Sequence, residues 1–359
     1  MLNKKDFLKY ASKLAFPIMI QNLIGTLVNL ADTVMLGYVS QTAMSASSLA
    51  NQYTFILFCL YYGMATGTSV LCAQYWGKGD KKTVERILGL AERISLIVSL
   101  IFFVISFTMP VTVMKIFTNS PDTIAAGSEY LKVISFSFMF MGFSQVFMSA
   151  LRSIGKIMLP SITYIVSLCV NVLCNATFIF GLFGFPKLGV TGAAIATVTA
   201  QFIVMSIMII CVIKQKKENV LKGTHLLAKI PAPYLNGICR IGIPTAIQGM
   251  AYCIISMVLT RMVSAFGAEA VATQRVGGQI ESVSWNTADG FASALNSFTA
   301  QNYGAGKMNR VRKGYRASLW TIGTWGLIIT LVFVFAPNTI ATIFFHEPKA
   351  ITIAVGYLI

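Results

Sequence analysis

Residues 14–38 read LAFPIMIQNLIGTLVNLADTVMLGY, and this stretch decides which fold and which function to expect. The segment is apolar and long enough to cross a hydrocarbon core of about 30 Å as a helix. Asp32 lies about two thirds of the way along it, with Asn29 three residues earlier on the same helix face. A carboxylate at this depth costs roughly 2.5–3.5 kcal/mol, so such residues face a cavity and function there. The sequence therefore predicts a membrane protein built around Asp32.

The rest of the chain predicts further membrane helices from end to end. Of its 359 residues, 56% are hydrophobic and only 11% are charged, and the mean hydropathy is +0.72. This composition excludes an ordinary soluble globular protein. The alternating pattern of β-barrel strands does not occur, so we expect an all-α polytopic membrane fold. The expected spans are residues 14–38, 50–75, 91–115, 128–150, 158–182, 189–213, 238–265, 279–301 and 317–340, with a tenth run that begins near Ala350.

Lysine and arginine gather in alternate loops, which predicts the orientation of the chain. The formal net charge is +16, which in a soluble protein would suggest a nucleic-acid partner. Here most basic residues fall in the N-terminal segment and in the loops on its side, whereas the opposite loops hold only Lys187 and Lys349. The positive-inside rule then places the N-terminus on the cytoplasmic side of the membrane, which we expect to be a bacterial inner or plasma membrane. The orientation of the chain in the membrane thus explains its positive net charge, so we expect no nucleic-acid partner.

A shift of 227 residues aligns the chain with itself without a gap. It places Pro17 on Pro244, Gln52 on Gln279 and Gly63 on Gly290. The same shift carries the motif AQxxGxG from residues 73–79 to residues 300–306. One offset kept over more than a hundred residues indicates an internal repeat.

The repeat predicts the domain organisation. The first unit contains six expected helices, an even number, so both units begin on the same side and are parallel, as in some secondary transporters. We expect an N-terminal six-helix lobe at residues 1–213, a cytoplasmic linker at 214–236 and a C-terminal lobe at 237–359. The second lobe is expected to be incomplete, with helices seven to nine and the start of helix ten. A full protein would then have twelve helices, of which nine or ten are present in a C-terminally truncated chain.

The sequence contains no motif that would indicate an enzyme or an ATP-driven pump. HExxH, GxSxG and Walker motifs are absent, and the seven cysteines form no CxxC pair. The glycines after the second and eighth spans have no preceding strand, so they predict helix ends and tight turns rather than a phosphate site. We expect no enzymatic activity, no cofactor and free thiols.

Polar residues inside the spans predict an ion site in the first lobe. A lone carboxylate such as Asp32 can reversibly bind H⁺ or a cation, and a possible Na⁺ at this residue is the one metal ion expected. Asn171 and Asn175 are four residues apart on one helix face, and their oxygens suit Na⁺ or a protonated carboxyl. The alternative for each amide, including Asn29, is a hydrogen bond between helices.

A second group of polar residues predicts a substrate cavity. Asp289 lies deep in the eighth span and could bind a cationic substrate, whereas Glu281 could instead pair with Arg275 near the outer end. Four glutamines at repeat-related positions could line the same cavity, and packing between helices is the alternative for them. These glutamines are Gln21, Gln52, Gln248 and Gln279.

Four motifs resemble those of the multidrug and toxic compound extrusion (MATE) transporters, and together they cover essentially the whole chain. They are Pro17 with NLADTVMLG at residues 29–37, AQYWGKG at 73–79, IFGLFGFPKLGVTGAAIAT at 179–197 and AQNYGAG at 300–306. The resemblance implies a twelve-helix exporter of small organic cations, driven by antiport of H⁺ or Na⁺. We expect this exporter to be a monomer in the lipid bilayer. Its two lobes would rock about a central cavity by alternating access, with the ion favouring the state that releases drug.

The resemblance also assigns residues to the first-lobe ion site. It implies that Asp32, Asn171 and the sixth-helix hydroxyl of Thr197 belong to this site. Many members carry an aspartate where this chain has Asn175, which removes one negative charge. Some members have an acid on the seventh helix where this chain has Tyr252, so an ion site of that type is not expected in the second lobe. Tyr252 is assigned to the substrate cavity instead.

Three other functions fit the sequence less well. A lipid-linked saccharide flippase of the related superfamily predicts a cationic cavity for pyrophosphate, and only Arg261 and Arg275 lie near membrane depth. A major-facilitator carrier also has parallel halves, but its Asp-Arg-x-Gly-Arg loop is absent after the second span. A membrane enzyme would need paired catalytic groups, which the sequence does not show. Cation-coupled export is therefore expected, with the flippase as the alternative.

Overall fold

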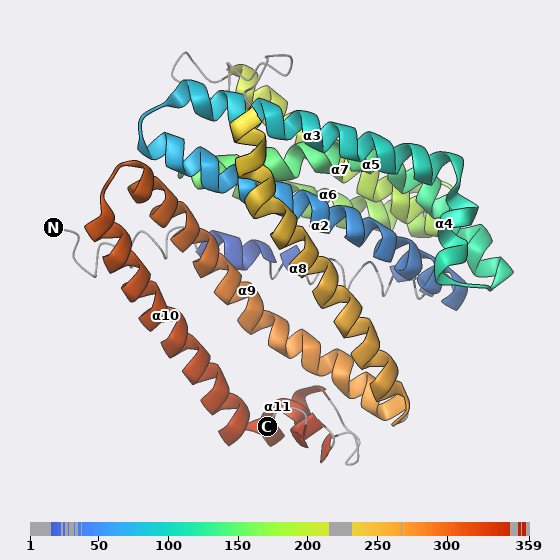
Figure 1. The fold of residues 1–359 in the computed structure, drawn as a ribbon. Helices are drawn as coiled ribbons and strands as arrows, with labels where there is room; N and C mark the ends of the chain where they lie inside the picture. The colour runs from blue at the N-terminus through green and yellow to red at the C-terminus, as the bar shows by residue number, and fades with distance from the viewer. Residues whose placement is uncertain are drawn as a thin grey trace. The chain divides into compact units, whose positions relative to one another are not determined.

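The computed structural model describes residues 16–22, 24–25, 28, 32, 35–36, 38–214, 232–266, 268–344, 351–352 and 354–356, and the regular structure in them is helical. Seven of the described helices are long and apolar enough to cross a membrane, which confirms the expected all-α polytopic fold. The elements are α2 (Gln41–Gly77), α3 (Lys81–Thr108), α4 (Pro110–Phe117), α5 (Pro121–Ser153), α6 (Met158–Phe180), the 3₁₀ helix η1 (Leu182–Gly184), α7 (Gly189–Lys214), α8 (Ala232–Ser264), α9 (Ala268–Gly304), α10 (Met308–Phe335) and α11 (Pro337–Phe344) (Figure 1).

Two of the expected spans are divided in the structure. The run at residues 91–115 becomes α3 followed by the short α4, and the run at 317–340 becomes α10 followed by α11. Each break comes just before a proline, Pro110 or Pro337, that occupies the first position of the next helix. Proline has no backbone N–H and disfavours a helical residue before it, so it ends one helix and begins another.

The helix bounds repeat with the same offset as the sequence. Helices α9, α10 and α11 begin and end 227 positions after α2, α3 and α4, respectively. The turns after α2 and α9 each contain a glycine in the left-handed region, Gly79 at φ 81° and Gly306 at φ 71°. Glycine adopts this conformation without the steric penalty of a Cβ atom, so the repeated GxG sequence gives both units the same helix end.

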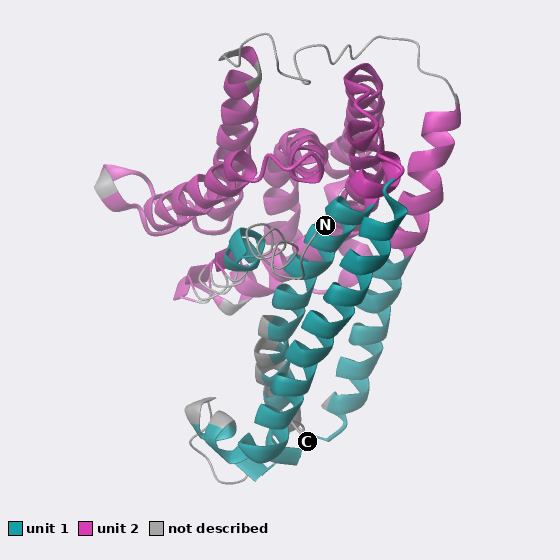
Figure 2. Cartoon of the chain, turned by 90° about the vertical axis from the view of Figure 1, so that its left-hand side faces the viewer, with its two compact units in different colours: residues 1–23, 248–299, 307–359 teal, residues 24–247, 300–306 magenta. Residues whose placement is uncertain are grey.

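The chain divides into two compact units (Figure 2). Unit 1 contains residues 1–23, 248–299 and 307–359, and unit 2 contains residues 24–247 and 300–306. The lobe bounds at residues 213 and 237 stay a prediction. Of the expected linker at 214–236, residues 215–231 lie outside the described part of the chain.

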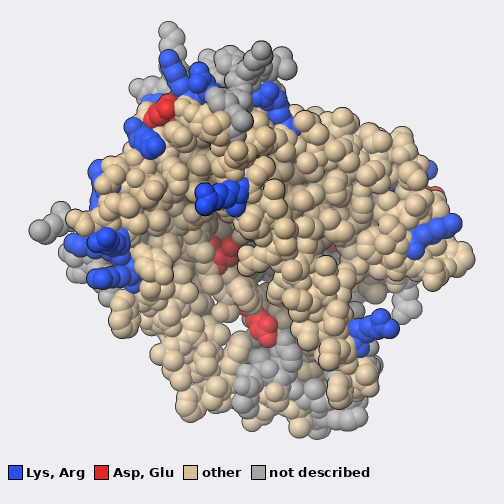
Figure 3. All heavy atoms as spheres, in the orientation of Figure 1, with Lys and Arg blue, Asp and Glu red and all other residues tan. Residues whose placement is uncertain are grey.

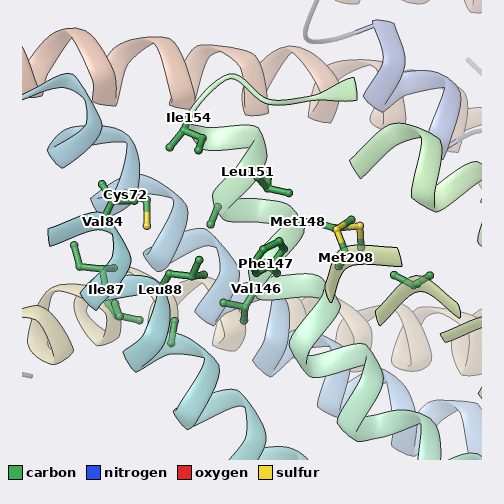
Figure 4. Packing of buried hydrophobic residues seen from close by; sticks show 14 residues of the cluster. Cys72, Val84, Ile87, Leu88, Val146, Phe147, Met148, Leu151, Ile154 and Met208 are labelled. Carbon is green, nitrogen blue, oxygen red and sulfur yellow. The ribbon is translucent and has the colours of Figure 1, made fainter. Parts of the chain in front are cut away.

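A close-packed apolar core joins α2, α3, α5, α7 and α8 in unit 2 (Figure 4). Leu88 of α3, Leu151 of α5 and Met208 of α7 are each at most 1% exposed. In a bilayer, close packing and hydrogen bonds hold helices together because lipid is as apolar as the side chains. Other members of the cluster are Cys72, Val84, Ile87, Ala91, Val146, Phe147, Met148, Ala150, Ile154, Val204 and Ile238.

A buried tyrosine ties three helices of unit 2 together beyond this core. The Tyr61 hydroxyl on α2 lies 2.6 Å from the Ser99 hydroxyl on α3 and donates to the Phe138 carbonyl on α5 at 3.0 Å. Tyr61 is fully buried. A buried hydroxyl needs such partners because leaving it unpaired is costly. These contacts fix the frame on which α5, α6 and α7 carry the polar residues described below.

Basic side chains gather over the end of α2 and α3 where the two helices join (Figure 3). Lys78, Lys81 and Lys82 are exposed there. Asp80 begins α3 by accepting hydrogen bonds from the Thr83 hydroxyl at 2.6 Å and the Thr83 amide at 3.1 Å. These bonds hold the pKa of the Asp80 carboxyl below its ordinary value of 3.8. The basic end is the one that the charge pattern predicts to be cytoplasmic.

Candidate functional site

Asp32 is hydrogen-bonded to α6 in unit 2. The Asn175 side-chain amide donates to Asp32 Oδ1 at 2.6 Å, across 143 positions of sequence. Asn175 is only 1% exposed, and Asp32 is half-buried. A hydrogen bond to an ionised carboxylate is shorter and stronger than one between neutral groups. The short Asn175–Asp32 distance therefore fixes the carboxylate against the inner face of α6.

The other predicted first-lobe residues extend this contact into a chain of hydrogen bonds. The same Asn175 amide also donates to Asn171 Oδ1 at 3.1 Å, one helical turn away. The Asn171 amide donates in turn to the Thr197 hydroxyl of α7 at 3.4 Å. Thr197 then donates to the Ala193 carbonyl at 3.1 Å. Four residues named from the sequence are thus brought together, while Asn29 lies outside the described residues.

The oxygens of this chain could hold a small cation or a proton. Asp32 contributes a carboxylate, Asn171 and Asn175 contribute amide oxygens, and Thr197 contributes a hydroxyl. Asn175 Oδ1 is buried and accepts no hydrogen bond from any residue that the structure describes. Carboxylate, amide and hydroxyl oxygens are hard ligands of the kind that alkali cations prefer, and they also hydrogen-bond a protonated carboxyl. Na⁺ and H⁺ therefore both suit the donor set.

One further residue near Asp32 was not predicted as a site residue. Tyr130 on α5 is a neighbour of Asp32. It is 4% exposed and donates to Asn51 Oδ1 of α2 at 3.2 Å. The repeat pairs Tyr130 with Tyr357, but nothing in the sequence places it beside Asp32. Its proximity depends on how α5 packs against the first helix.

A buried acid on α3 was also missed. Glu92 is 2% exposed, and neither carboxylate oxygen has a hydrogen-bond partner among the described residues. It lies one residue after the predicted start of its span, where an acid is expected to reach water. The spacing of Glu92, Ser95 and Ser99 places them along one face of α3, and this polar periodicity could have revealed the buried face.

The predicted cavity residues are distributed over both units. Gln52 is half-buried on α2 in unit 2, whereas the others belong to unit 1. In unit 1, the Asn22 amide lies 3.5 Å from Asp289 Oδ2, which brings the first helix and α9 together at this acid. A common substrate cavity stays a prediction. Gln21 is buried, Glu281 is half-buried, Gln248 and Tyr252 are exposed, and the side chain of Gln279 lies outside the described part of α9.

Comparison with known proteins identifies the family. The MatE family model matches residues 17–177 and 244–359. A relative from Thermotoga maritima, named a probable multidrug resistance protein NorM, is 30% identical over 349 residues, which are 95% of this chain and 73% of the relative. A Bacillus subtilis relative, the probable multidrug resistance protein YoeA, is 24% identical over 345 residues, or 94% and 73% of the two chains.

A solved structure shows the same fold. A crystal structure of MATE in complex with MaD3S has a TM-score of 0.87 at 21% identity and covers 98% of this chain and 77% of the other. The family model covers more than half of the chain, in both halves of the repeat. The chain belongs to the MATE family of multidrug transporters.

Proposed function

We propose that this transporter is a secondary active antiporter that exports small organic cations in exchange for H⁺ or Na⁺. The hydrogen-bond chain from Asp32 through Asn175 and Asn171 to Thr197 carries the proposal. It places one acid and several neutral oxygens together inside the membrane-spanning part of the chain. Apart from the coupling ion, no cofactor is required.

The ion would act by binding the two states of the transporter with different affinity. The donor set joins the first helix, α6 and α7, so a movement of any one of them changes the number of oxygens around the ion. A ligand shifts a conformational equilibrium only through such a difference in affinity. Ion binding at Asp32 would favour the state that releases drug outward, and ion release would allow the return by alternating access.

The remaining features of the proposal follow from the sequence and the relatives. The protein would work as a monomer in a bacterial plasma membrane with its N-terminus in the cytoplasm, which agrees with the exposed lysines at the α2–α3 turn. The two relatives described above are named as multidrug resistance proteins, so drug-like cations are the expected substrates. These names do not favour the flippase alternative.

The test is ethidium efflux by the parent chain and by Asp32→Asn, under separate Na⁺ and pH gradients. Asparagine has nearly the same size as aspartate, but it carries no negative charge and cannot bind or release a proton. Asp122→Asn is the matched control, because Asp122 is an exposed acid in the first turn of α5. Membrane insertion is checked for each protein.

Loss of gradient-driven efflux in Asp32→Asn alone supports the proposal, and the gradient that drives the parent identifies the ion. Full efflux by Asp32→Asn would reject Asp32 as the coupling residue and direct attention to Glu281 or Asp289. No efflux by the parent would reject the export of this cation and would bring the flippase alternative forward.

A further inference from the structure

Helix α6 carries a buried line of polar residues that continues beyond the proposed ion site. Thr163, Ser167, Asn171 and Asn175 follow one another at intervals of four residues, and we call them the α6 ridge. Their exposed fractions are 0%, 6%, 8% and 1%, respectively. Residues at this interval form one of the natural ridges of a helix surface. The proposed ion site uses only the last two, which leaves Thr163 and Ser167 unexplained.

The Thr163 hydroxyl does not make the hydrogen bond that other helical threonines make. Thr177 on the same helix, and Thr197 and Thr199 on α7, each donate to the backbone carbonyl four residues earlier. Thr163 Oγ1 is buried and has no hydrogen-bond partner among the described residues. A buried hydroxyl left in this way costs about 1–3 kcal/mol. The Thr163 hydroxyl is therefore available to a partner other than the described residues, such as a water molecule.

The two ends of the ridge share this property. Asn175 Oδ1 at the Asp32 end is also buried and accepts no hydrogen bond within the described part of the chain. Polar groups that are buried without protein partners are commonly satisfied by internal water. Asn171 and Asn175 each donate to a neighbouring helix, as helix-joining residues do. Thr163 Oγ1 and Asn175 Oδ1 have no such bond among the described residues, and these two atoms favour water as their partner.

The neighbouring helix supplies further polar groups for such water. The bond from Asn171 to Thr197 fixes the register of α6 against α7, and the turn at η1 makes the two helices antiparallel. One turn beyond Thr197, α7 carries the half-buried Gln201. One turn back along α6 is Ser167, so the register places these two residues beside each other. A buried water needs two to four polar partners, and this pair of helices offers them at successive turns.

The spacing of the ridge matches single water molecules. Four residues of α-helix rise about 6 Å, so the ridge from Thr163 to Asn175 is about 18 Å long. One water between two oxygens spans two hydrogen bonds of about 2.8 Å each. One bridging water per turn would therefore connect the ridge. Such a file can pass a proton from group to group, whereas a metal cation such as Na⁺ would need a full shell of oxygens at every step.

The ridge leads from the ion site to the end of α6 that is expected to face the cytoplasm. Helix α6 begins at Met158, shortly after Arg152 and Lys156. The titratable or charged side chains near the two ends are Asp32 and Tyr130 at one end, and Tyr164 and Arg152 at the other. None of the four ridge residues carries a charge. A proton moving along the ridge would therefore not be trapped by a titrating side chain between the two ends.

We propose that the α6 ridge holds a file of water molecules that conducts protons between Asp32 and the N-terminal end of α6. A proton leaving the Asp32 carboxyl enters the file, a proton leaves at the other end, and Asp32 returns to its carboxylate form. The proposal rests on the proposed function, in which Asp32 binds the coupling ion, and it specifies H⁺ as that ion. The file would let the proton bound at Asp32 leave along α6, within the N-terminal lobe.

The experiment compares the parent with Thr163→Val, which keeps the side-chain shape but removes the hydroxyl. Each protein is reconstituted in liposomes that contain a pH-sensitive dye, and proton movement is followed after a pH step in the presence of ethidium. Thr163→Ser restores the hydroxyl and tests rescue. Thr177→Val is the matched control, because it removes a back-bonded hydroxyl on the same helix but off the ridge.

We expect Thr163→Val to slow proton movement about tenfold, the effect of losing one hydrogen bond in the file, while ethidium binding at equilibrium stays unchanged. Thr163→Ser should recover the parent rate, and Thr177→Val should keep it. A parent-like rate with a raised melting temperature in Thr163→Val would show that the ridge is dry and would overturn the proposal. Slowed movement that Thr163→Ser does not rescue would assign Thr163 to packing and would also overturn it.

Asp32→Asn in the same liposomes separates the two proposals. If this variant loses coupled transport while Thr163→Val behaves as the parent, the water file fails and the proposed function stands. If Asp32→Asn retains coupled transport, both fail. A parent driven by Na⁺ alone rejects the proton file but leaves cation antiport at Asp32 in place.

Discussion

Replacing Gly77 or Gly304 by alanine tests a reciprocal contact in unit 2. At the end of α2, a Cβ added to Gly77 would overlap the carbonyl oxygen of Gln301 and would lie 2.8 Å from its carbonyl carbon. A Cβ added to Gly304 would overlap the carbonyl oxygen of Gln74 and would lie 2.7 Å from its carbonyl carbon. The two contacts are related by the repeat, because Gln74 and Gly77 correspond to Gln301 and Gly304. Backbone, rather than a flexible side chain, blocks the new atom at both positions.

The expected cost follows from this overlap. Relief requires the two backbone segments to move apart, since neither carbonyl can rotate away without breaking its helix. Overpacking of this kind typically costs about 1–3 kcal/mol. The gain in helix propensity from glycine to alanine, at most about 1 kcal/mol, offsets only part of it. Each single variant should therefore melt several degrees below the parent. The double variant should fall by less than the sum, because the first separation already makes room for the second Cβ.

Thermal unfolding of purified protein in detergent measures these effects, with Gly323→Ala as the control. Gly323 lies inside α10, has an ordinary negative φ, and has nothing within 4 Å of an added Cβ. Alanine there should leave the melting temperature unchanged or raise it. The reasoning is refuted if Gly77→Ala and Gly304→Ala melt like Gly323→Ala. It is also refuted if the double variant loses the full sum, because the two contacts would then be independent.

Three further substitutions test the packing of unit 2 by thermal unfolding. Tyr61→Phe removes a buried hydroxyl that donates to the Phe138 carbonyl, and should destabilise the protein by about 1–3 kcal/mol. Glu92→Leu replaces a buried carboxylate that has no hydrogen-bond partner among the described residues, and should raise the melting temperature. Asp80→Asn keeps a helix cap over Thr83 but cannot titrate. Since the pKa of Asp80 is lowered in the folded state, its charge stabilises the protein above pH 3.8 and this contribution is lost as the pH falls, so the parent should lose stability in acid more steeply than the variant.

Matched controls use exposed positions with the same chemical change. Tyr38→Phe removes a hydroxyl from a side chain that is 81% exposed, and Asp122→Asn neutralises an exposed acid. Both should melt like the parent. If Tyr61→Phe were as stable as Tyr38→Phe, the hydrogen bond from Tyr61 to the Phe138 carbonyl would not contribute the expected free energy to folding. A lower melting temperature for Glu92→Leu would contradict the inference that the buried carboxylate is destabilising. If the parent and Asp80→Asn lost the same stability as the pH falls, the Asp80 charge would not stabilise the folded protein.

The helices and their repeat could be predicted closely because they depend on local sequence. Every expected span that falls in the described residues is helical, and α2, α3 and α4 have counterparts at the offset of 227. A backbone inside a bilayer must satisfy its own hydrogen bonds, so an apolar run of sufficient length has little choice but a helix. The breaks at Pro110 and Pro337 were not predicted, although both prolines are in the sequence and proline cannot continue the preceding helix.

The first-lobe site could be predicted only in part. Asp32, Asn171 and Asn175 stand out because polar residues are rare within membrane spans. Tyr130 and Glu92 do not, since tyrosine is common near membrane surfaces and an acid at the end of a span can reach water. Their burial, at 4% and 2% exposed, depends on which face of α5 and α3 packs inward. The polar spacing of Glu92, Ser95 and Ser99 could have indicated the buried face of α3, whereas the pattern of α5 was too weak to define its buried face.

The sequence by itself determined that the chain crosses the membrane as helices, that it repeats, and which polar residues lie within the spans. These properties follow from the composition of each segment and from the need to satisfy backbone hydrogen bonds within it. Only the tertiary structure decided which of the polar residues meet. Asp32 and Asn175 are 143 positions apart, and the 2.6 Å bond between them exists because the first helix packs against α6. The Thr163 hydroxyl, which has no partner among the described residues, could likewise be recognised only from the tertiary structure, because a hydroxyl is unsatisfied only relative to the groups around it.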